Sequence, residues 1–240
     1  GDLKKTLPAK LRAAAAAGVR RPVAPEPPPP PPPRLSVQPA AVKRAPGAPA
    51  GGPVSTIIAI GASTGGTEAI QQVLLRMPED SPATVIVQHI PAGFSRAFAN
   101  RLNDTCPMRV KEAEDGDTLE NGLALVAPGN FHMLLRRAGA GYRVQIKDGP
   151  LVCYQRPAVD VLFNSVAETA PKKTVGVLLT GMGSDGARGL LRLREIGAGA
   201  SAQNDASCVV FGMPREAIRM GAAEQILALD RVAAGILSAI

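Results

Sequence analysis

Several kinds of residue are scarce in this sequence of 240 residues, which has no tryptophan, two tyrosines and only two histidines, His89 and His132. Any chemistry that needs an imidazole must therefore use one of these two side chains. The sequence also has no apolar run long enough to span a membrane, and its N-terminus lacks the apolar core of a signal peptide. We expect a cytoplasmic protein that does not insert into a membrane.

Cysteine is scarce as well, with Cys106, Cys153 and Cys208 lying far apart in the sequence. Their number is odd and their spacing matches no metal-ligand motif, so neither a disulfide framework nor a zinc site is indicated. We interpret them as reduced packing cysteines. We expect no metal and no cofactor.

The first fifth of the chain has few acidic residues and much proline. Before Gly52 there are 13 of the 23 prolines, nine basic residues and two acidic ones. The net charge of +7 therefore belongs to this segment, and the remaining 18 basic and 18 acidic residues balance, which gives no support to nucleic-acid binding. Because the run Pro27–Pro33 favours a stiff polyproline II spacer, we predict that residues 1–54 are a basic, Pro/Ala-rich disordered linker.

One short helix is predicted inside this linker. Leu3, Leu7 and Leu11 recur at four-residue spacing, which is typical of a helix, and Gly18 follows them. We interpret residues 2–17 as the last helix of a preceding domain. Since the chain begins with glycine instead of methionine, we expect it to be a piece of a longer protein.

Residues 55–240 alternate short apolar runs with helical patterns. Strands are predicted near 56–60, 83–88, 108–113, 123–127, 132–137, 142–147, 174–179 and 224–229, and helices near 67–76, 93–102, 185–196, 214–220 and 230–240. Runs without polar alternation, such as "TIIAI" and "TVGVLL", suit strands buried on both faces of a parallel sheet. We predict one doubly wound α/β domain, with a mostly parallel sheet flanked by helices and an antiparallel hairpin at 132–147.

Reactive side chains follow three of these predicted strands. Ser63 follows the first strand, His89 the second, and Asp185 the strand near 174–179. In open parallel sheets the functional crevice lies beyond the carboxyl ends of the strands. A serine nucleophile needs a base within reach, and the base needs an acceptor that fixes its tautomer. These three side chains can supply those roles.

Two alternatives remain open for these residues. His132, at the start of the predicted hairpin, is a second candidate for the base. Asp185 is also a natural N-cap for the helix that follows it. The glycines around Ser63 permit a sharp turn that exposes its hydroxyl and points backbone N–H groups at an oxyanion.

A glycine-rich turn after the first strand also suits a dinucleotide phosphate, so an NAD(P)-binding Rossmann-type oxidoreductase is the alternative function. The spacing Gly61, Gly65, Gly66 is not G-x-G-x-x-G, and Thr67 stands where short-chain dehydrogenases place another glycine. Neither Tyr142 nor Tyr154 has a lysine four residues later. These details favour the hydrolase.

The sequence resembles the catalytic domain of chemotaxis protein-glutamate methylesterases, the CheB family, from Thr56 to Ile240. The resemblance is carried, in order, by "IGASTGGTEA", "QHIPAGFSRAFANRLN", "VKEAEDGD", "APGNFHM", "RPAVDVLFNSVA", "VGVLLTGMGSDGA" and "AQNDASCVVFGMPREAI". It implies a serine hydrolase that removes methyl groups from glutamates on the cytoplasmic helices of chemoreceptors, releasing methanol in chemotaxis adaptation. It also implies deamidation of receptor glutamines.

The resemblance assigns roles to single residues. It implies that Ser63 of "GAST" is the nucleophile, His89 of "QHIP" the base and Asp185 of "GMGSDG" the acid that orients it. The oxyanion hole would use the backbone N–H groups of Thr64 and Met182. The family also implies a phosphoryl-accepting receiver domain as a partner, which would precede residues 55–240 and would be absent from this chain apart from the helix at 2–17.

Overall fold

The structure is a computed structural model that describes residues 53–170 and 174–240. The predicted helix at 2–17 lies outside the described residues, as does the predicted linker apart from Pro53 and Val54. No helix in the described ranges is both long enough and apolar enough to cross a bilayer.

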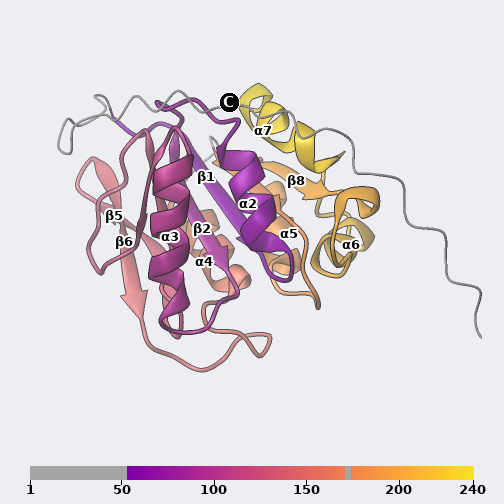
Figure 1. Ribbon diagram of the computed structural model, residues 1–240, viewed down its shortest axis with the longest axis horizontal. Helices are drawn as coiled ribbons and strands as arrows, with labels where there is room; N and C mark the ends of the chain where they lie inside the picture. Colours follow the sequence, from indigo (N-terminus) through magenta and orange to yellow (C-terminus); the bar gives the residue numbers. More distant parts are fainter. Residues whose placement is uncertain (1–52, 171–173) are drawn as a thin grey trace, which may run out of the picture. The chain divides into compact units, whose positions relative to one another are not determined.

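A seven-stranded parallel sheet forms the centre of the described residues (Figure 1). Its strand order is β3-β4-β2-β1-β7-β8-β9, and every neighbouring pair is parallel. The strands are β1 (Ile57–Ala62), β2 (Ala83–Gln88), β3 (Arg109–Glu112), β4 (Leu123–Val126), β7 (Thr174–Leu178), β8 (Gly199–Gln203) and β9 (Gln225–Leu227). This arrangement confirms the predicted mostly parallel sheet.

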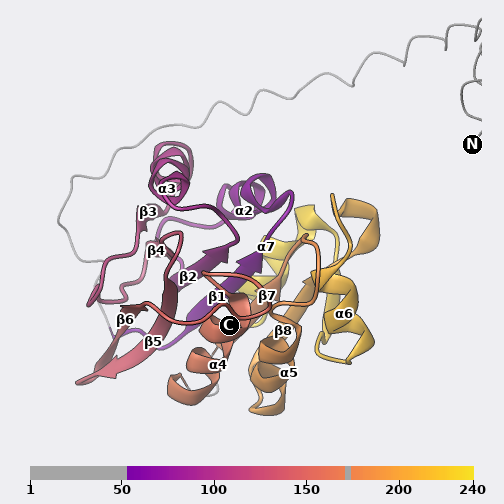
Figure 2. The same ribbon diagram turned by 90° about the horizontal axis from the view of Figure 1, so that it is seen from below.

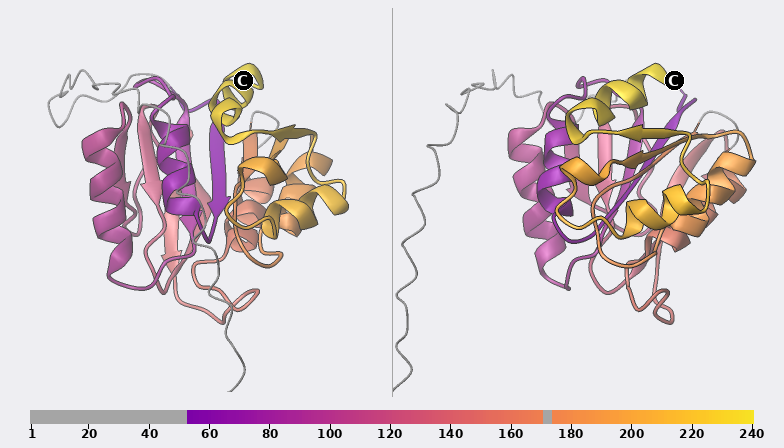
Figure 3. Two further views of the ribbon diagram at one scale, coloured as in Figure 1. Left: turned by 45° about the vertical axis from the view of Figure 1, so that its right-hand side comes forward. Right: turned by 90° about the vertical axis from the view of Figure 1, so that its right-hand side faces the viewer.

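Helices cover both faces of the sheet. Figure 2 shows α2 (Gly66–Leu74) and α3 (Phe94–Thr105) on one face, and α4 (Val159–Thr169) and α5 (Ala187–Glu195) on the other. Figure 3 turns the strands β8 and β9 forward and shows α6 (Met213–Arg219) and α7 (Leu229–Ser238) beside them. The helices on the two faces enclose two separate apolar cores.

Strand β1 shows why both faces must be covered. Its six residues are all buried, and successive side chains enter opposite cores. Ile58 and Ile60 pack with α2, α3 and α7, whereas Ile57 and Ala59 pack with α4, α5 and α6. An uninterrupted apolar run is therefore what this position in the sheet requires.

The predicted hairpin is confirmed as β5 (His132–Ala138) paired antiparallel with β6 (Gly141–Lys147). Met133, Leu135 and Val144 from this hairpin join the core beneath α4. The backbone N–H of Leu135 also donates to the buried hydroxyl of Ser165 on α4, at 2.9 Å. The hairpin is thus attached to one face of the domain.

One α-helix and one strand were not predicted from the sequence, α4 and β8. Helix α4 carries apolar residues at Val159, Leu162, Phe163 and Val166, which is the spacing of an amphipathic helix. Strand β8 reads "GASAQ", and its small residues have little intrinsic β preference. It forms because its neighbours β7 and β9 hydrogen-bond to it, which is a tertiary effect.

The strand order places a topological switch point between β1 and β7. The chain moves outward from β1 to β2, and later from β7 to β8 in the opposite direction. The connection after β1 enters α2 on one face, whereas the connection after β7 enters α5 on the other. A crevice is expected between the carboxyl ends of these two strands.

Candidate active site

Ser63 lies in a tight turn between β1 and α2, at the switch point. Its backbone N–H donates to the carbonyl of Thr180 beyond β7 at 3.0 Å, and its own carbonyl accepts from Gly66 at 2.8 Å. Gly65 has a φ of 79°, a left-handed value that glycine adopts without strain. A Cβ atom at Gly181 would lie 2.7 Å from that of Ser63, so the β7 loop approaches the serine closely.

His89 occupies the equivalent position at the end of the neighbouring strand. Ala62 and Gln88 are paired in register as the last residues of β1 and β2, so Ser63 and His89 each follow one of them. The backbone N–H of His89 also donates to the carbonyl of Ala62 at 3.0 Å. The register of two parallel strands therefore sets the serine and the histidine side by side.

Asp185 contacts the same histidine from the loop that precedes α5. Its Oδ2 lies 2.7 Å from His89 Nε2, and the two side chains are 2% and 6% exposed. The pair is therefore almost completely removed from water, where a charge-assisted hydrogen bond is strong. Two of the side chains predicted to act together are in direct contact.

The carboxylate of Asp185 accepts hydrogen bonds from the N-terminus of α4, the helix that follows the β5–β6 hairpin in the chain. Val159 N–H donates to Oδ2 at 2.6 Å, and Asp160 N–H donates to Oδ1 at 2.9 Å. These are the first two amides of α4, where the helix dipole favours a negative charge. The alternative interpretation of Asp185 as N-cap of its own following helix is wrong, since Gly186 is the N-cap of α5 and makes no side-chain cap bond.

The other ring nitrogen of His89 determines what the imidazole can do. Nδ1 is buried and has no hydrogen-bond partner among the described residues. Because Nε2 faces a carboxylate, which only accepts, Nε2 carries the proton and Nδ1 carries the lone pair. The ring can therefore accept a proton at Nδ1.

His132, the alternative base, has a different environment. It is 5% exposed, its Nε2 donates to the carbonyl of Pro150 at 2.9 Å, and its Nδ1 accepts from the N–H of Ala158 at 3.3 Å. Both ring nitrogens are used by backbone groups. The ring joins the start of β5 to the segment before α4, and the geometry favours His89 as the base.

Thr64 and Met182, predicted as oxyanion donors, lie on the two loops beside Ser63. Their backbone N–H groups donate to no other described residue, and Met182 is 74% exposed. The carbonyl of Thr64 accepts from Thr180 Oγ1 at 3.0 Å, which helps to fix this turn. Both amides are thus available to a ligand, and their role as oxyanion donors stays a prediction.

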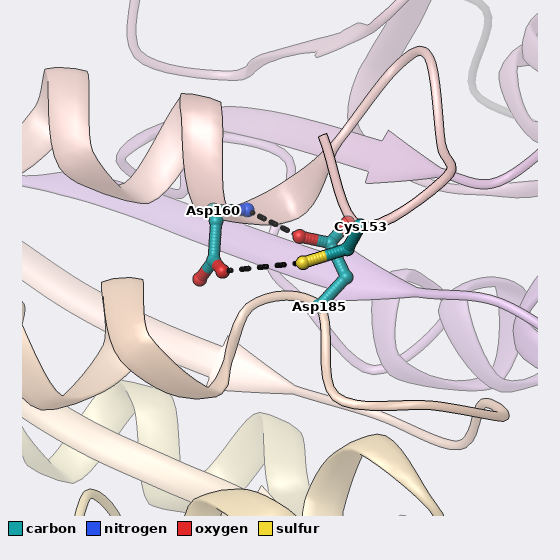
Figure 4. Close-up of side chains that lie close together, drawn as sticks. All are labelled: Cys153, Asp160 and Asp185. Carbon is teal, nitrogen blue, oxygen red and sulfur yellow. Dashed lines mark hydrogen bonds between the residues drawn. The ribbon is translucent and has the colours of Figure 1, made fainter. Parts of the chain in front are cut away.

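Cys153 and Asp160 are two neighbours of Asp185 that the sequence analysis did not place at the site (Figure 4). One ligand atom from each of the three side chains lies within 4.8 Å of the others. The Cys153 thiol donates to Asp160 Oδ2 at 3.9 Å, and Asp160 Oδ1 accepts from the N–H of Gly189 at 2.7 Å. Burial raises the pKa of the Asp160 carboxyl, although the hydrogen bond from Gly189 opposes that rise.

A sulfur and two carboxylates could hold a cation, but their hydrogen bonds indicate another role. Asp185, which precedes α5, accepts from the first amides of α4, whereas Asp160, in the first turn of α4, accepts from an amide of α5. The two helices therefore cap each other with carboxylates. We interpret the cluster as this reciprocal capping and assign it no metal.

The cysteine thiols are poorly suited to nucleophilic chemistry. Burial raises the pKa of Cys208 to about 11 and also raises that of Cys106. Burial and the charges of Asp185 and Asp160 raise the pKa of Cys153. Since the thiolate is the reactive form, all three are weak nucleophiles at neutral pH.

Comparisons with known proteins agree with this geometry. A family model described as CheB methylesterase matches residues 58–236. A protein of Syntrophus aciditrophicus named protein-glutamate methylesterase/protein-glutamine glutaminase 2 is 52% identical over 97% of this chain and 65% of its own length. The protein-glutamate methylesterase/protein-glutamine glutaminase of Escherichia coli K12 is 57% identical over 77% of this chain and 53% of its own length.

A solved structure is similar as well. The crystal structure of the Thermotoga maritima CheB methylesterase catalytic domain aligns with a TM-score of 0.76 at 35% identity. The alignment covers 78% of this chain and 99% of that chain. The alignment thus covers nearly the whole of that catalytic domain. This chain spans between about half and two thirds of the length of the two curated relatives above. These matches give no support to the NAD(P)-dependent oxidoreductase that was the alternative.

Proposed function

We propose that this chain, which belongs to the CheB methylesterase family, hydrolyses methyl esters of glutamate side chains to glutamate and methanol. The single observation that carries the proposal is the buried His89–Asp185 pair, with its unoccupied Nδ1, at the strand end next to Ser63. In this proposal residues 55–240 are the catalytic domain and residues 1–54 the linker to a receiver domain.

The first half of the reaction forms an acyl-enzyme. Ser63 Oγ attacks the ester carbonyl carbon while His89 Nδ1 takes the hydroxyl proton, which gives a tetrahedral intermediate and an imidazolium. The N–H groups of Thr64 and Met182 donate to the oxyanion. His89 then returns the proton to the methoxy oxygen, the C–O bond breaks, and methanol leaves.

The second half restores the enzyme. A water gives its proton to His89 and attacks the Ser63 ester, and collapse of the second tetrahedral intermediate returns that proton to Ser63 Oγ. The product is the free glutamate side chain. Asp185 stays ionised throughout: it fixes the ring orientation and the tautomer and stabilises the imidazolium.

The same groups can act on a glutamine side chain, with ammonia as the leaving group instead of methanol. The names of the relatives in Syntrophus aciditrophicus and Escherichia coli K12 include protein-glutamine glutaminase, which supports this second activity. The substrates we propose are the cytoplasmic helices of chemotaxis receptors, so the protein would act in the cytoplasm.

The proposal is tested by methanol release from methyl-labelled receptor membranes, comparing the wild type with Ser63→Ala. We expect release that requires Ser63, and labelling of Ser63 by a fluorophosphonate probe. Equal release by the two proteins would overturn the assignment. A change in NAD(P)H fluorescence on mixing, without methanol release, would support the alternative function, an NAD(P)-binding oxidoreductase.

A further inference from the structure

Gln88 is a buried amide that contacts the backbone of both the serine and the histidine. It is the last residue of β2 and is 3% exposed. Its Nε2 donates to the carbonyl of Ser63 at 2.8 Å and to the carbonyl of His89 at 3.0 Å. One side-chain NH₂ group therefore joins the turn after β1 to the turn after β2.

The orientation of this amide is fixed by its surroundings. Two carbonyl oxygens face one end, so that end must be the nitrogen, because an oxygen there would only be repelled. Oε1 is buried without a partner among the described residues and lies against Gly66, where any side chain would clash with it. Gly66 is the first residue of α2, and the positive end of that helix favours the amide oxygen.

The bond to the Ser63 carbonyl also sets the direction of a neighbouring donor. The carbonyl of Ser63 and the N–H of Thr64 belong to one peptide unit, which is planar, and in a trans peptide they point in opposite directions. Gln88 Nε2 and the Gly66 N–H each donate to this carbonyl at 2.8 Å, so together they hold it, and the Thr64 N–H must point the other way. That N–H donates to no described residue, so it is left for a ligand.

We propose that Gln88 is a positioning residue for catalysis, which orients the oxyanion-hole amide of Thr64 through the carbonyl of Ser63 and fixes the backbone of His89 relative to it. The proposal rests on the methylesterase mechanism above and deepens it. Gln88 Nε2 bonds the backbone carbonyls of Ser63 and His89, which are not reacting atoms in that mechanism, so its role is positioning. Its effect should appear in the transition state, where the oxyanion forms, and not in the binding of the ester.

The test uses two substitutions of similar size. Gln88→Met removes both donated hydrogen bonds. Gln88→Glu places a carboxylate against two carbonyls, where burial and repulsion favour its protonated form, and a protonated carboxyl can again donate one bond. Since loss of a whole oxyanion donor costs about 10²-fold to 10³-fold, we expect Gln88→Met to lower kcat by about 10-fold to 100-fold with KM changed less than about threefold.

The pH profile separates positioning from loss of folding. We expect the activity of Gln88→Glu relative to wild type to rise as pH falls, because protonation restores a donor. The matched control is Ser165→Ala, which removes a buried hydroxyl that accepts from Leu135 N–H and donates to the Leu162 carbonyl, and these bonds include no residue of the proposed site. It should lower Tm while leaving kcat unchanged.

Two readouts keep this proposal distinct from the proposed function. Fluorophosphonate labelling of Ser63 needs the oxyanion hole but no receptor, so Gln88→Met should slow labelling by a factor similar to its loss of kcat. If wild type labels but releases no methanol, the proposed substrate is wrong and labelling still tests Gln88. A folded Gln88→Met protein with wild-type kcat and labelling rate, or one in which only KM changes, would overturn the positioning role.

Discussion

The carboxyl end of the sheet and the β5–β6 hairpin each contain one of the two histidines, and the two regions use the same side chain in opposite ways. Both imidazoles are nearly buried, and each lies at a strand end: His89 follows β2, and His132 is the first residue of β5. His89 bonds a carboxylate through Nε2 and leaves Nδ1 unpaired among the described residues, whereas backbone groups occupy both nitrogens of His132. Burial and strand position therefore do not distinguish a base from a structural histidine, but hydrogen-bond partners do.

The same contrast extends to the surrounding backbone. In the hairpin the strands pair along their whole length, from His132 with Lys147 to Ala138 with Gly141. At the carboxyl end of the sheet the N–H groups of Thr64 and Met182 are left without described partners, next to the buried Thr180, whose carbonyl accepts from Ser63 and whose hydroxyl donates to the Thr64 carbonyl. Unpaired donors held on a rigid frame are what stabilisation of an oxyanion requires.

The largest effect is expected at the serine. Ser63→Ala should lower kcat on the order of 10⁴-fold or more, and adding His89→Ala should cost little further, because the groups act as a unit. Single-turnover methanol release measures both. Losses that multiply in the double variant would show that the two residues act independently.

Asp185→Asn should come next, with a loss of about 10³-fold to 10⁴-fold in kcat. An asparagine NH₂ facing Nε2 would favour the tautomer that carries its proton on Nδ1, which is the wrong one for accepting from Ser63. Labelled receptor membranes measure the loss. Asp160→Asn, at the neighbouring carboxylate, is the matched variant and should retain most of the activity, and an equal loss in both would point to helix capping instead.

His132→Leu should show the opposite pattern from any change at His89. It leaves the Pro150 carbonyl and the Ala158 N–H without their partner, so it should lower the free energy of unfolding by about 1 to 3 kcal/mol. Urea unfolding measures that loss, and kcat below the unfolding transition should stay within about threefold of wild type. A large fall in kcat with unchanged stability would make His132 the base after all.

Asp160 should give a smaller, pH-dependent effect on stability. Its pKa is raised in the folded protein, so the folded state binds a proton more readily than the unfolded state, where the value is near 3.8. The stabilising contribution is therefore present at pH below about 3.8 and is lost as pH rises through the raised pKa. An asparagine stays neutral, so we expect the stability of Asp160→Asn relative to wild type to increase as pH rises through that window. The free energies of unfolding of wild type and Asp160→Asn, measured in urea at several pH values, should diverge as pH rises. A constant difference between them would show that ionisation of Asp160 is not the cause.

The cysteines should give the smallest effect on activity. Cys208→Ser should change kcat by less than about twofold, because a thiol with a pKa of about 11 is protonated at neutral pH. Iodoacetamide should alkylate the exposed Cys153 before the half-buried Cys208, which mass spectrometry can follow as pH is raised. Rapid modification of Cys208 at pH 7 would show that its burial does not suppress the thiolate.

Much of the fold could be predicted because its signals are local. The runs at β1, β2 and β7 are apolar and end in glycines or polar residues, and the helices after them carry regular apolar spacing. Strand β8 could not be found in this way, since a segment of glycine, alanine and serine becomes a strand through its neighbours. Helix α4 was readable but was missed, and with it the two amides that hold Asp185.

The sequence by itself determined which residue types are available and which strand each one follows: a serine, a histidine and an aspartate after three buried runs, with only one other histidine in the chain. Tertiary structure alone decided which of them meet. The register of β1 with β2 brings Ser63 beside His89, the α4 N-terminus holds Asp185 against His89, and backbone groups engage both nitrogens of His132. These contacts join residues that are far apart in the chain, and hydrogen bonding depends on distance and direction in space, which no local pattern encodes.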